Sequence, residues 1–305
     1  MGMTRRYPIA LAALIAALPT PLLAAPAPAA NGTELAQACA GLDGWSQPAP
    51  PARVDGNTWY IGTCGITVLL VSTPDGLVVI DSGPRDVAPF VLANIARLGF
   101  KARDVRWLLT THEHHDHAGS LAQLQRATGA KVATLASSRR VLESGVPSAD
   151  DPQSGALDPM APVSVDRVLA DGDSVVVGGL ALTVHETPAH SPGSASWTWQ
   201  SCDAGFTCRM IAYADSATTV SSDGYRFTDH PDRIARIRIG HARIAELPCD
   251  VLVTPHPSAS NLFDRLAGKA PLVDPQACRT YASGAAARFE ARLAAEAATA
   301  TGTVK

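Results

Sequence analysis

The sequence contains 305 residues, of which 46% are hydrophobic, 5% aromatic and 17% charged, and its formal net charge is -3. Such a chain can bury a sizeable core made mostly of Val, Leu, Ile and Ala, and its weak negative charge offers no basic surface for a nucleic acid. Length alone would allow two domains, but no linker-like stretch interrupts the middle of the chain, so we expect one.

The first thirty residues have the three-part pattern of a secretory signal peptide. Arg5 and Arg6 precede the hydrophobic run IALAALIAALPTPLLAA, and the small residues of APAPAANG follow it. We therefore predict a signal peptide over 1–30, a single domain over 31–305 and a periplasmic location. The mature chain is expected to start between Ala25 and Gly32.

A membrane anchor is the alternative interpretation of this segment. Pro19 and Pro21 interrupt the hydrophobic run, which disfavours an anchor. No later segment is apolar for long enough to span a membrane, so we expect no span in the mature protein. The stretch TRRY is a weak indication of twin-arginine export, and the export route stays open.

The first half of the mature chain reads as strands followed by a helix. Apolar runs and the turn TPDG predict strands over 59–61, 66–72 and 77–81, and a helix over 86–98. The run VRWLLTT then predicts a buried strand that ends at Thr110 or Thr111.

A cluster of histidines and acids follows this strand in the stretch TTHEHHDHAGS. His112 and His114 point the same way in a near-extended segment, whereas Asp116 and His117 come where the chain must turn. The leucines of AGSLAQLQRATGA then have helical spacing. The cluster is therefore expected in a loop between a strand and a helix, where an open metal site can form.

Imidazole and carboxylate ligands suit zinc, which takes about four ligands and leaves one position open in catalytic sites. One short segment cannot surround an ion, so other ligands must come from elsewhere in the chain. His190 lies in ETPAHSPGS after the strand LALTV, and His256 lies in VLVTPHPSAS just past another buried strand. Three histidine sites at strand ends indicate one shared metal centre.

The rest of the chain forms a second mixed set of strands and helices. We predict a strand at KVATL, a helix at SSRRVLES and a loop over 147–162. Next come a hairpin over 174–186, a second hairpin within SWTWQSCDAGFTCRMIAYAD, a helix over 231–246 and an Ala-rich C-terminal helix that starts at PQACR.

The pattern H-x-H-x-D-H over 112–117, followed by His190 and His256, resembles the metallo-β-lactamase superfamily. The segments GNTWYIGTCGITVLLVSTPDGLVVIDSG, SPGSASWTW, AYADS and CDVLVTPHPSASN are similar to those of secreted subclass B3 enzymes. No cysteine follows IAYA, as subclass B1 would require, and His112 is not the asparagine of subclass B2. The resemblance implies an α/β fold, a four-layer αββα sandwich in a single domain.

The resemblance also implies a centre with two Zn²⁺ ions per chain. It assigns one set of three ligands to the first zinc, His112, His114 and His190, and another to the second zinc, Asp116, His117 and His256. A zinc-bound hydroxide, oriented by Asp116 as a catalytic residue, would open the β-lactam ring of penicillins, cephalosporins and carbapenems, which gives antibiotic resistance.

Other residues take their roles from the same resemblance. Ser216 and Thr218 would hold the substrate carboxylate beside the second zinc, and Gln153 lies in a loop that covers the site. Asp81 is a candidate hydrogen-bond partner of a ligand histidine. Asp215 is predicted not to be a ligand, because Ser216 occupies the metal-facing place in the B3 pattern.

All six cysteines can pair in an oxidising compartment, and the sequence alone permits fifteen pairings. The hairpin assignment brings Cys202 to Cys208. The resemblance suggests Cys249 with Cys278, which leaves Cys39 with Cys64.

A secreted dinuclear zinc lactonase, or another ester or thioester hydrolase of the superfamily, is the alternative function. The export signal and the six cysteines fit poorly with thioester detoxification in the cytosol. A lactonase is therefore the more serious rival.

Overall fold

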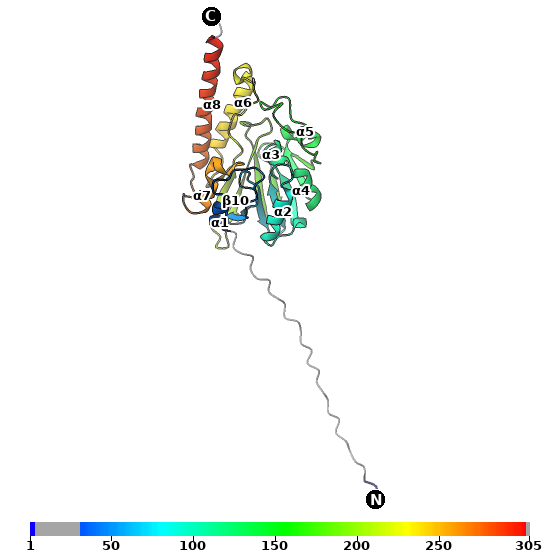
Figure 1. Cartoon of the computed structure of the whole chain (residues 1–305). Helices are drawn as coiled ribbons and strands as arrows, with labels where there is room; N and C mark the ends of the chain where they lie inside the picture. The colour runs from blue at the N-terminus through cyan, green and yellow to red at the C-terminus, as the bar shows by residue number, and fades with distance from the viewer. Residues whose placement is uncertain (4–30, 303–305) are drawn as a thin grey trace.

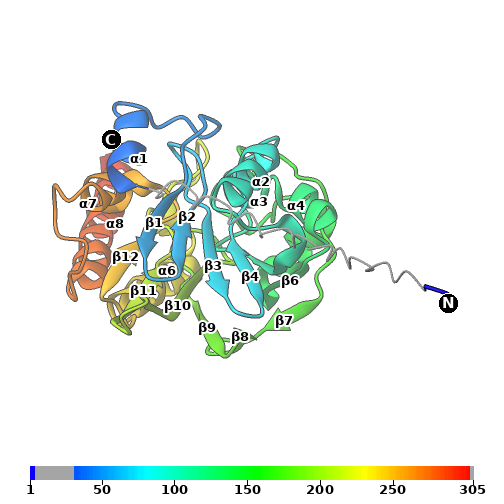
Figure 2. The ribbon, with the colours of Figure 1, turned by 90° about the horizontal axis from the view of Figure 1, so that it is seen from below.

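The computed structural model describes residues 1–3 and 31–302. The predicted signal peptide falls almost entirely outside the described residues. Two β-sheets lie face to face, and helices cover the outer face of each (Figures 1 and 2). This is the αββα sandwich in one domain that the resemblance implied.

The larger sheet has seven strands in sequential order and comes from the first half of the described chain. Its first four strands pair antiparallel and its last four pair parallel. The strands are β1 (Ala52–Asp55), β2 (Thr58–Tyr60), β3 (Leu69–Thr73), β4 (Gly76–Ile80), β5 (Val105–Leu109), β6 (Lys131–Leu135) and β7 (Arg167–Leu169).

The smaller sheet has the order β12-β11-β10-β9-β8. Only the β11–β12 pair is parallel. The strands are β8 (Ser174–Val177), β9 (Leu180–Glu186), β10 (Ala195–Cys202), β11 (Cys208–Tyr213) and β12 (Val251–Val253).

The helices form the two outer layers. Those of the first half are α1 (Gly32–Ala38), α2 (Ala88–Arg97), η1 (Ala102–Asp104), α3 (His115–Ala118), α4 (Leu121–Thr128) and α5 (Ala136–Ser144). Those of the second half are η2 (Phe227–Asp229), α6 (Pro231–Ala245), η3 (Pro257–Ser260), α7 (Leu262–Leu266) and α8 (Ala277–Gly302). The long helix α8 packs beside α6 and extends past it (Figure 1).

Strand β4 shows why both faces of the larger sheet are covered. All five of its residues are buried. Val78 and Ile80 belong to the core between the sheets, whereas Leu77 and Val79 pack under α2 and α4. Successive side chains of a strand point to opposite faces, so a continuous apolar run requires a packed layer on each side.

The structure differs from the predicted elements in three respects. Helix α1 and strand β1 were not predicted. The strand expected over 66–72 starts only at Leu69, because the N–H of Thr67 bonds to the carbonyl of Pro255 in the other half of the chain. The expected loop after His114 contains the one-turn helix α3, closed by a bond from the N–H of Ala118 to the carbonyl of His114.

Three disulfides connect all six cysteines in the expected pairs, which are Cys39–Cys64, Cys202–Cys208 and Cys249–Cys278. The second closes the β10–β11 hairpin, where the two cysteines lie opposite each other in register. Within the described residues, no helix has the length and apolarity needed to cross a membrane.

Candidate metal centre

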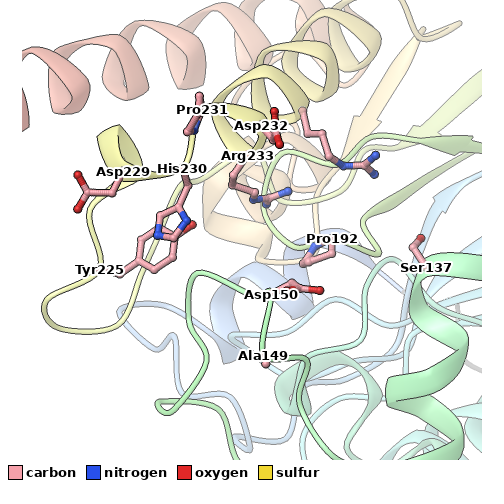
Figure 3. A pocket seen from close by; sticks show the side chains of 11 residues that line it. Ser137, Ala149, Asp150, Pro192, Tyr225, Asp229, His230, Pro231, Asp232 and Arg233 are labelled. Carbon is pink, nitrogen blue, oxygen red and sulfur yellow. The ribbon is translucent and has the colours of Figure 1, made fainter.

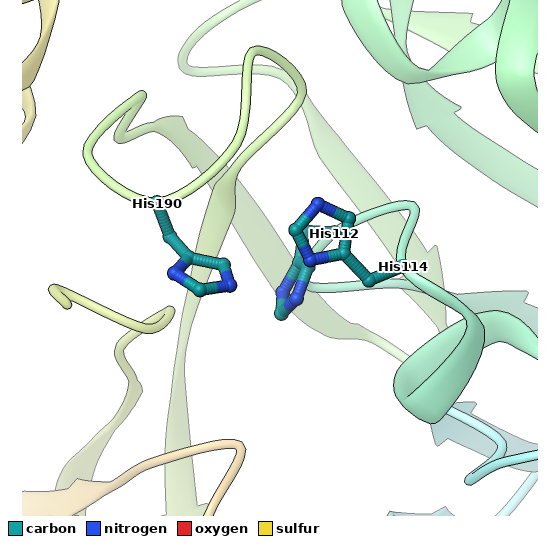
Figure 4. Close-up of side chains that lie close together, drawn as sticks. All are labelled: His112, His114 and His190. Atoms are coloured by element: carbon teal, nitrogen blue, oxygen red, sulfur yellow. The ribbon is translucent and has the colours of Figure 1, made fainter. Parts of the chain in front are cut away.

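Three histidines from two distant segments face one another at the strand ends. His112 and His114 follow β5, and His190 lies in the turn between β9 and β10 (Figure 4). The ring centroids are 4.6 Å apart for His112 and His114, 4.8 Å for His112 and His190, and 5.0 Å for His114 and His190. One candidate ligand atom from each ring lies within 4.8 Å of the others.

A second group lies next to the first. Candidate ligand atoms of His112, Asp116 and His117 also lie within 4.8 Å of one another. His256 approaches from the end of β12, and its Nε2 lies 3.4 Å from Oδ2 of Asp116. The structure therefore brings together all six residues that the sequence singled out, with His112 between the two groups.

Most of these imidazoles have one nitrogen engaged away from the cluster. Nδ1 of His112 lies 2.8 Å from Asp215 Oδ1, and Nε2 of His114 lies 2.9 Å from Asp151 Oδ2. Nδ1 of His190 lies 2.8 Å from the carbonyl oxygen of Thr218. Such contacts fix the ring orientation and leave the other nitrogen for a metal.

The unengaged atoms fit a metal ion. Nε2 of His112 is buried without a hydrogen-bond partner, which would be costly unless a ligand occupies the site. Burial, together with the neighbouring His117, lowers the pKa of His112 well below its usual value. Burial, together with His114, lowers the pKa of His190 to about 3. Both rings are therefore neutral at pH 7, the form that binds zinc.

His117 and Asp116 form a tightly coupled pair. Burial alone would lower the pKa of His117, but the carboxylates of Asp116 and Asp81 outweigh burial and raise it to about 10. Burial alone would raise the pKa of Asp116, but His117 and His256 reverse that effect and lower it. A proton thus stabilises this pair in the absence of a cation, and a bound metal would replace it.

Asp81 lies beside the centre at an ion-pair distance that is too long for the hydrogen bond expected from the sequence. Its Oδ2 lies 3.6 Å from Nδ1 of His117. The same carboxylate accepts hydrogen bonds from the N–H and hydroxyl of Thr111 and from the hydroxyl of Tyr213. The end of β4 is therefore anchored to the metal-binding segment and to β11.

Two of the predicted substrate contacts, Thr218 and Gln153, lie close to His190, which belongs to the first group of ligands. The hydroxyl of Thr218 is 3.1 Å from His190 Nδ1, and Nε2 of Gln153 is 3.3 Å from His190 Nε2. Ser216 is buried next to Asp215. The carboxylate of Asp215 points to His112 and serves as its hydrogen-bond partner.

Sequence reasoning missed two residues of the site. Asp151, which holds His114, lies in the loop over 147–162, and no spacing connected it to the motif. Trp45 lies near the rings of His115 and His256, with both centroid distances 5.9 Å. No motif or spacing in the sequence around either residue predicts a role in the site, because each comes close to the centre only when a long loop folds over it.

A separate cavity of about 550 Å³ lies beside the first turn of α6 (Figure 3). The rings of Tyr225 and His230 stack in the wall of this cavity, with their centroids 4.4 Å apart. None of the six candidate ligands lines it.

The sequence profile of the metallo-beta-lactamase superfamily matches residues 61–262 of the chain. Among solved structures, the metallo-β-lactamase MIM-1 from Novosphingobium pentaromativorans is 70% identical, with a TM-score of 0.87 over 88% of this chain and 99% of that one. MEM-A1, a subclass B3 metallo-β-lactamase isolated from a soil metagenome library, is 40% identical, with a TM-score of 0.80 over 84% of this chain and all of that one, 100%.

Curated relatives match a shorter part of the chain. A hydroxyacylglutathione hydrolase from Anaeromyxobacter dehalogenans is 34% identical over 139 residues, which is 46% of this chain and 44% of that protein. The chain therefore spans less than half of the length of that relative. The subclass B3 structures match over nearly their whole length.

Proposed function

The chain belongs to the metallo-β-lactamase superfamily and, within it, to subclass B3, and from this premise we propose that it hydrolyses the amide bond of β-lactam antibiotics in a zinc-dependent reaction. The main support for this proposal is that six candidate metal-binding side chains from both halves of the chain lie close together. Penicillins, cephalosporins and carbapenems are the proposed substrates. Resistance to them is the biological consequence.

We propose that the chain holds two zinc ions. His112, His114 and His190 are the ligands of the first, and Asp116, His117 and His256 are those of the second. Two adjacent groups of imidazoles and a carboxylate support this assignment. Zinc in such a centre lowers the pKa of water toward 7 and so supplies a nucleophile at neutral pH.

The residues of the chain bind and orient the reactants. Asp116 is the proposed catalytic residue, as the hydrogen-bond acceptor that orients the attacking nucleophile. Ser216 and Thr218 are proposed to donate hydrogen bonds to the substrate carboxylate. Gln153, whose Nε2 lies 3.3 Å from Nε2 of His190, is proposed to contact the substrate as well. Holding that carboxylate brings the lactam carbonyl over the centre.

We also propose a periplasmic location and an N-terminal signal peptide over 1–30. The three disulfides support an oxidising compartment. Mass spectrometry of the protein secreted by a bacterial host would test the cleavage site, which is expected between Ala25 and Gly32.

The partial likeness to hydroxyacylglutathione hydrolases favours thioester hydrolysis as the second candidate function. Lactone hydrolysis is the further alternative that the resemblance to the superfamily leaves open. The deciding experiment compares a carbapenem, an acyl-homoserine lactone and a glutathione thioester with one zinc-loaded preparation. Rapid carbapenem hydrolysis is expected. Fast lactone or thioester hydrolysis with negligible lactam hydrolysis would refute the proposal.

Asp116→Ala is the control for that experiment. It removes a ligand and the catalytic acceptor, and we expect lactam hydrolysis to fall by more than about 100-fold. A monocyclic lactam with a sulfonate in place of the carboxylate should be a poor substrate for the unchanged enzyme, because the proposed carboxylate contacts do not match it.

A further inference from the structure

A buried glutamate lies between two of the candidate ligands. Glu113 separates His112 from His114 in the sequence, and its side chain is only 3% exposed. Among the salt bridges of the described residues, none involves Glu113. A carboxylate buried without a cation must be stabilised by hydrogen bonds.

Three donors from two other segments supply those hydrogen bonds. The hydroxyls of Ser138 and Ser191 lie 3.1 and 3.0 Å from Oε2, and the backbone N–H of Gly193 donates to Oε1 over 3.1 Å. Ser138 belongs to α5, whereas Ser191 and Gly193 follow His190 directly. One side chain thus joins three parts of the fold.

Gly193 shows how closely these parts approach. A Cβ added at this position would lie 2.3 Å from Oε2 of Glu113 and 2.1 Å from the hydroxyl oxygen of Ser138. That hydroxyl oxygen is also 2.9 Å from the carbonyl oxygen of Gly193. The turn after His190 is therefore held against Glu113 with no room for a side chain.

We infer that Glu113 is a positioning residue of the metal centre: by holding the His190 turn against the segment that carries His112 and His114, it sets the geometry of the first group of ligands. This rests on the proposed metal site but not on the proposed substrate. Glu113 acts through Ser191, Gly193 and Ser138.

The carboxylate is well suited to this role, because its two oxygens accept from all three groups, with the single hydroxyl proton of Ser138 shared between Oε2 and the carbonyl oxygen of Gly193. Alanine would remove every one of these bonds. Glutamine keeps the shape, and its amide oxygen can accept from Gly193 while the serine hydroxyls rotate to accept from its nitrogen. Glu113→Gln should therefore rescue most of what Glu113→Ala loses.

The test measures zinc affinity by competition with a chromophoric chelator and records the d–d spectrum of the cobalt-substituted protein. We expect Glu113→Ala to weaken the affinity for one metal equivalent by about 10- to 100-fold and to change the cobalt spectrum. The zinc affinity of Glu113→Gln should stay within a few-fold of wild type. The zinc affinity of Ser138→Ala should lie between those of Glu113→Ala and Glu113→Gln. Glu246→Ala is the matched control, because this glutamate is exposed and forms no salt bridge with another described residue.

Apo-protein melting, measured in parallel, separates positioning from stability. A lower melting temperature with unchanged zinc affinity and cobalt spectrum would overturn the inference, as would equal metal affinity in all variants. If Glu113→Ala does not fold, the zinc affinities and cobalt spectra of Ser138→Ala and Glu113→Gln are compared with those of wild type. Weaker binding by Ser138→Ala then supports the inference, and affinities equal to wild type in both variants overturn it. A lack of lactam hydrolysis by the wild type would refute the proposed function and leave the metal-affinity result valid.

Discussion

At the residue scale, each histidine of the first group needs a partner on the side away from the metal. Asp215, Asp151 and Thr218 supply these partners from segments far from the H-x-H-x-D-H motif. A hydrogen bond there fixes the ring and makes the free nitrogen a better ligand. The non-ligand role predicted for Asp215 is consistent with its contact to His112.

Asp215→Ala should weaken zinc binding by about 10- to 100-fold, because it removes the acceptor 2.8 Å from Nδ1 of His112. Asp215→Asn keeps an oxygen acceptor and should recover part of the affinity. Chelator competition measures both. Asp75→Ala, in an exposed turn, is the control, and equal affinity for Asp215→Ala and this control would contradict the prediction.

At the scale of elements, the disulfides differ in the length of chain that they close. Cys202–Cys208 closes a hairpin with a sequence separation of 6, whereas Cys249–Cys278 joins the start of β12 to α8 with a separation of 29. A disulfide lowers the entropy of the unfolded chain more when its loop is longer. The hairpin is also held by the β10–β11 ladder without its disulfide.

Replacing both cysteines of a pair by serine tests this difference. Loop-entropy estimates give a loss of about 2 kcal/mol for Cys202–Cys208 and about 3.6 kcal/mol for Cys249–Cys278. We therefore expect a larger drop in stability for the second variant, measured by denaturant unfolding of the zinc-loaded proteins. Equal losses would show that strain or packing, rather than loop length, governs the contribution.

At the scale of the whole molecule, the metal centre joins the two halves of the sandwich. His112 to His117 follow strand β5 of the larger sheet, whereas His190 and His256 follow strands β9 and β12 of the smaller one. A metal bound by both sets stabilises only the folded chain, since the ligands are far apart in the unfolded chain.

Removal of zinc should therefore lower the melting temperature as well as abolish activity. At a free zinc concentration 100 times the dissociation constant, binding adds about 2.7 kcal/mol, which corresponds to roughly 5 °C for a chain of this size. Calorimetry of the chelator-treated and zinc-loaded proteins measures the shift. Magnesium, which prefers oxygen ligands, is the control and should give none. Identical melting with and without zinc would refute the role of the metal as a link between the halves.

The sequence by itself determined the metal chemistry, the order of most strands and helices, and the hairpin disulfide. These features depend on local patterns, such as the continuous apolar run of β4, the spacing of His112 to His117, and the short separation of Cys202 and Cys208. The resemblance to subclass B3 supplied the other two disulfides and the fold. Local chemistry is readable because it depends on neighbours along the chain.

Only the tertiary structure decided what holds these residues in place. Asp151 reaches His114 across 37 positions, Asp215 reaches His112 across 103, and Glu113 reaches Gly193 across 80. Such contacts depend on how the two sheets pack and how loops close over their ends, and no periodic pattern records a pairing between segments this far apart.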